Sequence, residues 1–238
     1  MLSKVLFFIS LSFIPSLARI GQDETAFFNS TNPESNSSNS ELNIFDTTDS
    51  SIVGGYIVNS PEKFPFIVSI MEVDFWSNKA AHACAGTLVA PDVVLTAAHC
   101  VNYNANRVVD AGRFSWYDDS STEPFRVTGV YIHPDFNKQF FSHDVALLKL
   151  NGKSRSQVAQ LKKGERILNV GDIIEIAGWG LTSERGRPSP NLLEAQVKVL
   201  SKNNCQYFYG KYFSETMMCA YGNGQGKSFK TLLRFAFS

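Results

Sequence analysis

The chain has 238 residues, with 22 basic and 22 acidic side chains and a formal net charge of zero at pH 7. This balance offers no basic surface for nucleic acid and no polybasic patch for a membrane, so we expect neither as a partner. Hydrophobic residues make up 44% of the chain and aromatic residues 13%, enough for a substantial core in one or two domains.

Residues 1–18 have the pattern of a secretory signal peptide. The charge of Lys4 precedes a short apolar run at 5–14, and small residues follow up to Ala18. We expect cleavage after Ala18 and a secreted, extracellular protein. The apolar run is well short of the roughly 20 residues that a membrane-spanning helix needs, so we expect no membrane span. Secretion makes disulfides the first interpretation of the four cysteines.

The segment 19–51 differs sharply in composition from the rest of the chain. It is rich in Ser, Asn and Thr, carries several acidic residues and has no Lys or Arg from residue 21 onward. Such a composition predicts disorder. Asn29 and Asn36 begin the sequences NST and NSS, which fit the acceptor pattern for N-glycosylation. The segment is either a solvated spacer or a pro-segment, and the residues after it decide between these interpretations.

After residue 51 the sequence is typical of a β protein. Short runs of Val, Ile and Phe are separated by Gly, Pro, Asn and Asp, while helical periodicity is scarce. Strands are expected at 66–70, 86–89, 93–96, 145–150, 173–177 and 195–200. Many short strands without an internal repeat indicate barrels or a sandwich, and periodicity alone does not choose between them.

Four short motifs follow one another in a characteristic order. They are IVGG at 52–55, LTAAHC at 95–100, HDVALLKL at 143–150 and GWG at 178–180. Each is weak alone, but the ordered set resembles the trypsin/chymotrypsin family of serine proteases from residue 52 to about 227. The resemblance implies an all-β fold of two six-stranded antiparallel β-barrels, protein or peptide substrates, and neither a cofactor nor a metal. It also favours the pro-segment interpretation of 19–51.

The resemblance implies catalytic roles for two residues. His99 would be the general base, because an imidazole can take a hydroxyl proton and return it to a leaving amine. Asp144 would hold the imidazole in the required tautomer, and its place ahead of an apolar strand predicts partial burial. His143 stands where the family usually has a small polar residue.

Ile52 would be the new N-terminus after activation in the zymogens of this family. Those zymogens are usually cut after Lys or Arg, whereas Ser51 precedes Ile52 here. We therefore expect either a protease of other specificity to cut at this point or the acidic segment to stay attached.

The resemblance also implies two disulfides. Cys84 would pair with Cys100 and close the loop that carries the catalytic His, and Cys205 would pair with Cys219 in the second barrel. A metal site is a poor alternative for the cysteines, because the sequence has no CxxC and only four His.

A separate acidic group comprises Asp118, Asp119 and Glu123, in a region where some relatives bind calcium. Carboxylates in a polar turn are usually solvated, so we expect no metal there.

The third catalytic element is missing from the sequence. Relatives carry a Gly-Asp-Ser-Gly-Gly motif after the second-barrel cysteine, and this chain has none. After Cys219, the serine and threonine residues are Ser228, Thr231 and Ser238, and none of them is flanked by glycines. No Asp or Glu follows Glu215 to receive the α-amino group of Ile52. Without a nucleophile or an oxyanion hole, the chain is predicted to be inactive.

The sequence therefore predicts a trypsin-like domain over 52–238 that is truncated at its C-terminus and has an incomplete second barrel. The apolar tail 232–237 either covers an open strand edge or ends without a partner, and we expect the second outcome. Three interpretations stay open. The favoured one is a truncated product of a secreted serine endopeptidase. The others are a non-catalytic homologue with a binding or inhibitory role, and an adhesive or structural module.

Overall fold

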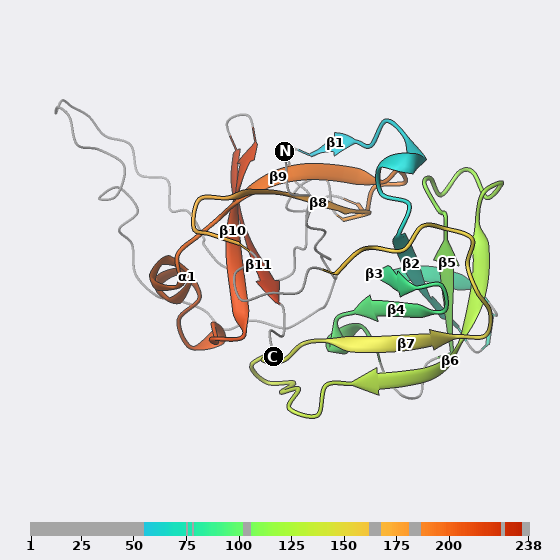
Figure 1. Ribbon diagram of the computed structural model, residues 1–238, viewed down its shortest axis with the longest axis horizontal. Helices are drawn as coiled ribbons and strands as arrows, with labels where there is room; N and C mark the ends of the chain where they lie inside the picture. The colour runs from blue at the N-terminus through green and yellow to red at the C-terminus, as the bar shows by residue number, and fades with distance from the viewer. Residues whose placement is uncertain are drawn as a thin grey trace, which may run out of the picture.

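The computed structural model describes residues 55–74, 76–77, 79–101, 106–161, 168–180, 187–224 and 227–234, with side chains described up to residue 222. The predicted signal peptide, the 19–51 segment with Asn29 and Asn36, and Ile52 lie outside these residues. The described chain is mostly strand, with one α-helix, α1 (Lys202–Tyr209), and short 3₁₀ turns. Strands β2 to β7 gather on one side of the molecule, and strands β8 to β11 with α1 gather on the other (Figure 1).

The first unit is a closed six-stranded barrel. Its strand order is β2-β3-β4-β7-β6-β5, with every neighbouring pair antiparallel. The strands are β2 (Ile67–Val73), β3 (Ala80–Ala90), β4 (Val93–Thr96), β5 (Arg107–Ala111), β6 (Glu123–Ile132) and β7 (Ala146–Leu150). Alternate residues of β7 are buried, as expected where one face of a strand lies on a core. The predicted first barrel is therefore confirmed.

The interior of this barrel is apolar and fully enclosed. Val68, Ile70, Leu88, Val94 and Leu148 have no exposed surface, and they come from four different strands. Burial of branched aliphatic side chains on the inner faces of many strands is what closes a small barrel around side chains rather than around a channel. The core thus fixes the pairing of β4 with β7, which positions the candidate site described below.

The second unit is an open five-stranded sheet. Its central strand is β9 (Leu193–Val199), which pairs with β8 (Ile173–Gly178) and also with β1 (Tyr56–Ile57) and β10 (Met217–Gly224). The buried side chains of this sheet include Ile174 and Ile176 on β8 and Val197 on β9. Among the described residues the sheet does not close on itself, so the prediction of an incomplete second barrel is confirmed.

The last strand, β11 (Lys227–Arg234), corrects one expectation. It pairs antiparallel with β10 in a continuous register that runs from Met217 opposite Arg234 to Gly224 opposite Lys227. The expectation that the tail from residue 232 ends without a partner is therefore wrong for residues 232–234. The physical reason is that the edge of β10 presents unpaired N–H and C=O groups, and an adjacent strand satisfies them.

A third cluster of buried side chains joins the two units. Trp179, Phe64, Val58 and Leu192 are each at most 2% exposed and pack together. Backbone hydrogen bonds reinforce the junction, since the N–H of Val58 donates to the carbonyl of Leu192 at 2.9 Å. The GWG motif of the sequence therefore marks the seam between the barrel and the sheet.

Both predicted disulfides are present. Cys84 on β3 is bonded to Cys100, and Cys205 on α1 is bonded to Cys219 on β10, with Cα–Cα distances of 6.0 and 5.7 Å. Each closes a short loop and stabilises the fold by about 3 kcal/mol if its main effect is to restrict the unfolded chain. Among the described residues, no helix has the length and apolar character needed to cross a membrane.

Candidate active site

Strand register brings His99 and Asp144 together. Thr96, the last residue of β4, lies opposite Ala146, the first residue of β7. His99 follows in the 3₁₀ turn Ala98–Cys100, and Asp144 stands just before β7. Because the two strands are antiparallel, the end of one and the start of the other meet at the same rim of the barrel. Two residues separated by 45 positions in the chain thereby become neighbours.

The Asp144 side chain makes two hydrogen bonds to His99. Its Oδ2 lies 2.5 Å from the ring Nδ1, and its Oδ1 accepts the backbone N–H of His99 at 2.8 Å. The Asp144 side chain is fully buried, and the His99 side chain is 9% exposed. A carboxylate is an acceptor only, so the hydrogen bond assigns the ring proton to Nδ1. The lone pair is then on Nε2, the atom that can take a proton from a substrate or nucleophile.

The ring of Phe141 packs against the ring of His99. Their centroids lie 5.6 Å apart with an interplanar angle of 83°, an edge-to-face arrangement. Phe141 is itself 9% exposed and belongs to a buried cluster with Phe213 and the disulfide-bonded Cys205 and Cys219. The imidazole is therefore fixed by a carboxylate and also contacted by a buried aromatic ring.

His143, the departure from the family pattern, has a clear structural role. Its ring stacks on that of His133, with centroids 4.9 Å apart and planes inclined by 20°. Its backbone N–H donates to Oγ1 of Thr216 at 3.4 Å. The φ angle of His143 is 52°, in the left-handed region that only a few non-glycine residues adopt. The turn before Asp144 is thus held by a ring stack and by a contact to the second unit.

A serine–histidine pair, missed in the sequence, lies inside the barrel wall. Ser69 Oγ and His82 Nδ1 are 2.8 Å apart. Ser69 has no exposed surface, so no substrate reaches this hydroxyl and the pair is not a nucleophile–base site. The His82 ring lies 5.2 Å from the ring of Trp116 and 5.6 Å from that of Trp179. The available signal was a polar residue at 69 within an apolar strand.

His82 is expected to make the stability of the fold depend on pH. Burial, with a smaller effect from the charge of Arg113, lowers the pKa of His82 from 6.5 to about 4. The folded state therefore resists protonation that the unfolded chain accepts below pH 6.5. Stability is full above that pH and falls as the pH drops towards 4, by up to about 3 kcal/mol.

Urea unfolding at pH 7.5 and pH 4.5 tests this dependence. The variant His82→Asn, which keeps a short polar side chain but does not titrate, should lose less stability between the two pH values than the unmodified chain. An equal loss in both chains would show that other groups carry the pH dependence.

The acidic residues 118, 119 and 123 do not converge. Asp118 accepts the N–H of Ser120 at 2.9 Å, Asp119 pairs with Arg113 at 2.7 Å, and Glu123 lies 3.3 Å from the guanidinium of Arg155. Each carboxylate thus has its own partner within the protein.

Within the part of the chain that the structure describes, one group of side chains has metal-ligand spacing, namely Cys84, His99 and Cys100. Its two sulfurs are bonded to each other, so they do not act as thiolate ligands.

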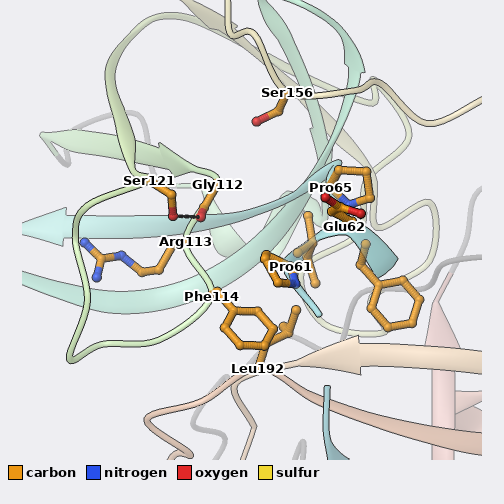
Figure 2. Close-up of a pocket in the computed structure, with 11 residues that line it drawn as sticks. Pro61, Glu62, Pro65, Gly112, Arg113, Phe114, Ser121, Ser156 and Leu192 are labelled. Carbon is orange, nitrogen blue, oxygen red and sulfur yellow. Dashed lines mark hydrogen bonds between the residues drawn. The ribbon is translucent and has the colours of Figure 1, made fainter. Parts of the chain in front are cut away.

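A pocket of about 210 Å³ lies away from His99 and Asp144, neither of which lines it (Figure 2). Its apolar walls include Pro61, Phe114 and Leu192, which face one another in the close-up. Two of its polar side chains have partners, since Ser121 Oγ donates to the carbonyl of Gly112 at 3.0 Å and Arg113 pairs with acidic side chains. The pocket contributes nothing to the candidate active site.

The structure gives no side-chain position for the predicted N-terminus Ile52 or for the serine and threonine residues after Cys219. Ile52 and Ser238 lie outside the described residues, and Ser228 and Thr231 are described only as positions on β11. The structure therefore brings His99 and Asp144 together and forms both predicted disulfides.

Comparison with known proteins gives a consistent result. The family model described as Trypsin matches residues 52–230, a region that contains His99, Asp144 and all four cysteines. A trypsin of Saccharopolyspora erythraea is 34% identical over 172 residues, covering 71% of this chain and 73% of that protein. Granzyme E of Mus musculus is 31% identical over 185 residues, covering 76% and 72% of the two chains. The solved structure of GrC has 25% sequence identity and a TM-score of 0.65, covering 71% and 75%.

Proposed function

The chain belongs to the trypsin family of serine proteases, and we propose that His99 and Asp144 are its general base and the carboxylate that orients this base. The family implies protein substrates. The observation that carries the proposal is that the fully buried Asp144 carboxylate accepts two hydrogen bonds from His99, at 2.5 Å from the ring Nδ1 and at 2.8 Å from the backbone N–H. This arrangement leaves Nε2 as the basic atom of the ring.

The arrangement suits peptide-bond hydrolysis through an acyl-enzyme. Nε2 takes the proton of a hydroxyl nucleophile as that oxygen bonds to the scissile carbonyl carbon, and the proton then passes to the leaving amine. Water repeats the sequence and releases the acid. Asp144 stays ionised throughout and stabilises the imidazolium that forms between the transfers.

We further propose that a polypeptide with this sequence has no measurable peptidase turnover. General-base catalysis needs a hydroxyl to act on and backbone donors for the oxyanion, and the sequence after Cys219 carries no Gly-Asp-Ser-Gly-Gly motif to supply them. The missing motif supports a serine endopeptidase chain in an inactive form.

A fluorophosphonate probe tests this proposal, since it labels a serine that a neighbouring base activates. The chain produced from residue 19 to 238 should remain unlabelled and should not hydrolyse peptide substrates. Labelling that disappears in the variant His99→Ala would contradict the proposal, because it would reveal a working nucleophile next to the base.

A non-catalytic secreted homologue, acting as a binding or inhibitory protein, is the second candidate. One observation favours it: β11 pairs with β10 along its whole length, so this edge of the second unit is covered by the chain's own tail. Limited proteolysis distinguishes the candidates. Protection of 168–234 as one fragment supports a folded binding protein, whereas digestion of this region with survival of the first barrel counts against it.

The N-terminal segment completes the proposal. We propose that 1–18 direct secretion and that 19–51 are a pro-segment glycosylated at Asn29 and Asn36, as their acceptor patterns suggest. Mass spectrometry of secreted material, before and after enzymatic deglycosylation, tests both points. An N-terminus at Arg19 would indicate that the segment is retained, and one at Ile52 that it is removed.

A further inference from the structure

We propose that Phe141 is a positioning residue, which packs against the His99 ring and keeps it next to Asp144. The Phe141 side chain is itself held in a buried cluster that contains the Cys205–Cys219 disulfide of the second unit. The inference rests on the proposed function, because it concerns the same histidine and aspartate. It assigns a residue that the sequence motifs do not mark.

The first observation is the direct contact between the two rings. Phe141 meets His99 edge to face, with centroids 5.6 Å apart, while Asp144 binds the ring at Nδ1. A hydrogen bond at one atom still allows the imidazole to swing about its side-chain torsions. A buried ring against it removes that freedom, because close-packed side chains have no space in which to rotate.

The second observation is where Phe141 is anchored. It belongs to a buried cluster with Cys205, Phe213, Met217 and Cys219, which are all at most 8% exposed. These four residues come from α1, β10 and the segment between them, all in the second unit. The backbone of Phe141, in contrast, belongs to the β6–β7 connection of the first barrel, the same connection that carries Asp144. Phe141 therefore links the disulfide-bonded part of one unit to the base of the other.

The third observation is the backbone of the connection. Phe141 has a φ angle of 54° and His143 one of 52°, both in the left-handed region. Bulky residues occupy this region only when the surrounding structure requires it, and such residues cluster at functional sites. The conformation is held locally, since the carbonyl of Asn137 accepts the N–H of Phe141 at 2.6 Å, and Oδ1 of Asn137 accepts the N–H of Gln139 at 2.9 Å. In this backbone conformation, the Phe141 ring lies in the buried cluster of the second unit.

The test is the exchange rate with water of the His99 Nδ1 proton, measured by NMR on ¹⁵N-labelled chain. Replacing Phe141 by leucine keeps an apolar side chain but removes the ring edge, so the proton should exchange about tenfold faster. The conservative variant Phe141→Tyr should restore slow exchange. The matched control is Phe64→Leu, which makes the same change at another buried phenylalanine, on the seam between the units.

The double variant Cys205→Ala/Cys219→Ala tests the anchor without touching Phe141. It should accelerate the exchange as Phe141→Leu does, and it gives an independent answer if the leucine variant does not fold. Exchange at the unmodified rate in either folded variant would overturn the proposal, as would an equal acceleration in Phe64→Leu.

The outcomes also separate this inference from the proposed function. If the unmodified chain shows no Nδ1 proton bonded to Asp144, both fail. If that proton is present and Asp144→Asn removes it while Phe141→Leu leaves it unchanged, only the positioning role of Phe141 fails.

Discussion

Replacing Asp144 by asparagine is expected to remove the Nδ1 proton of His99 while the chain stays folded. Asp144 accepts two hydrogen bonds, one at each carboxylate oxygen. Asparagine has nearly the same shape but only one acceptor oxygen. If that oxygen still accepts the hydrogen bond from the backbone N–H of His99, the amide NH₂ group faces Nδ1. Because NH₂ is a donor, Nδ1 must then accept, and the ring proton moves to Nε2. The atom that should act as the base would then carry the proton.

The ¹⁵N chemical shifts of the two ring nitrogens measure this change directly, because protonated and unprotonated imidazole nitrogens are well separated in the spectrum. The control is Asp92→Asn, which alters a carboxylate paired with Lys149 at 2.6 Å on the other end of the barrel strands β4 and β7. This control should leave the His99 signals unchanged. An Nδ1 proton that persists in Asp144→Asn would mean that the carboxylate does not set the tautomer.

Replacing Trp179 by alanine is expected to cause a large loss in the free energy of unfolding. Trp179 is 1% exposed and lies in the cluster that joins the barrel to the sheet, with ring contacts to His82 and to Trp116. Removing a fully buried indole forfeits its transfer free energy and leaves a cavity that the two units cannot easily close. The free energy of unfolding should fall by about 4 kcal/mol.

Urea unfolding followed by far-UV circular dichroism measures this loss. The matched control is Trp76→Ala, since the Trp76 side chain is 90% exposed and its removal should change the free energy of unfolding by less than about 0.5 kcal/mol. Similar losses in the two variants would contradict the assignment of Trp179 to the seam.

The sequence predicted those strands whose residues form apolar runs. The segments 93–96 and 173–177 match β4 and β8 closely. Strands β5 and β6 were missed for identifiable reasons. β5 contains Arg107 and Asp110, which are buried charges, and Asp110 is neutralised by Arg113 from beyond the strand at 2.8 Å. β6 begins with Glu123 and alternates exposed with half-buried residues, so no apolar run marks it. Such strands depend on partners that a local pattern does not reveal.

In the candidate site, too, the sequence reveals some residues and not others. His99 and Asp144 could be found because they lie in the motifs LTAAHC and HDVALLKL, and the two cysteine pairs because the family resemblance implies them. Phe141 and the pair Ser69–His82 could not, since a polar residue at 69 within an apolar strand is a signal for Ser69 but does not name its partner, and nothing in the local sequence marks Phe141. They meet their partners only through strand register and through the packing of one unit against the other.

The tail shows a further limit of local reasoning. The sequence predicted that resemblance to the family ends after residue 227, and the family model matches up to residue 230. Residues 231–234 lie beyond that match, and yet they pair with β10 in register. Backbone hydrogen bonding in a sheet is largely indifferent to side-chain identity, so an unrelated segment of suitable length can occupy a strand edge.

The tautomer of His99 in the unmodified chain, read from a long-range ¹H–¹⁵N spectrum at pH 7.5, tests the proposed catalytic pair most directly. We expect a protonated Nδ1, protected from exchange by its hydrogen bond to Asp144, and an unprotonated Nε2. A proton on Nε2, or an imidazole that exchanges freely between both tautomers, would contradict the proposal that this chain forms the base of a serine protease.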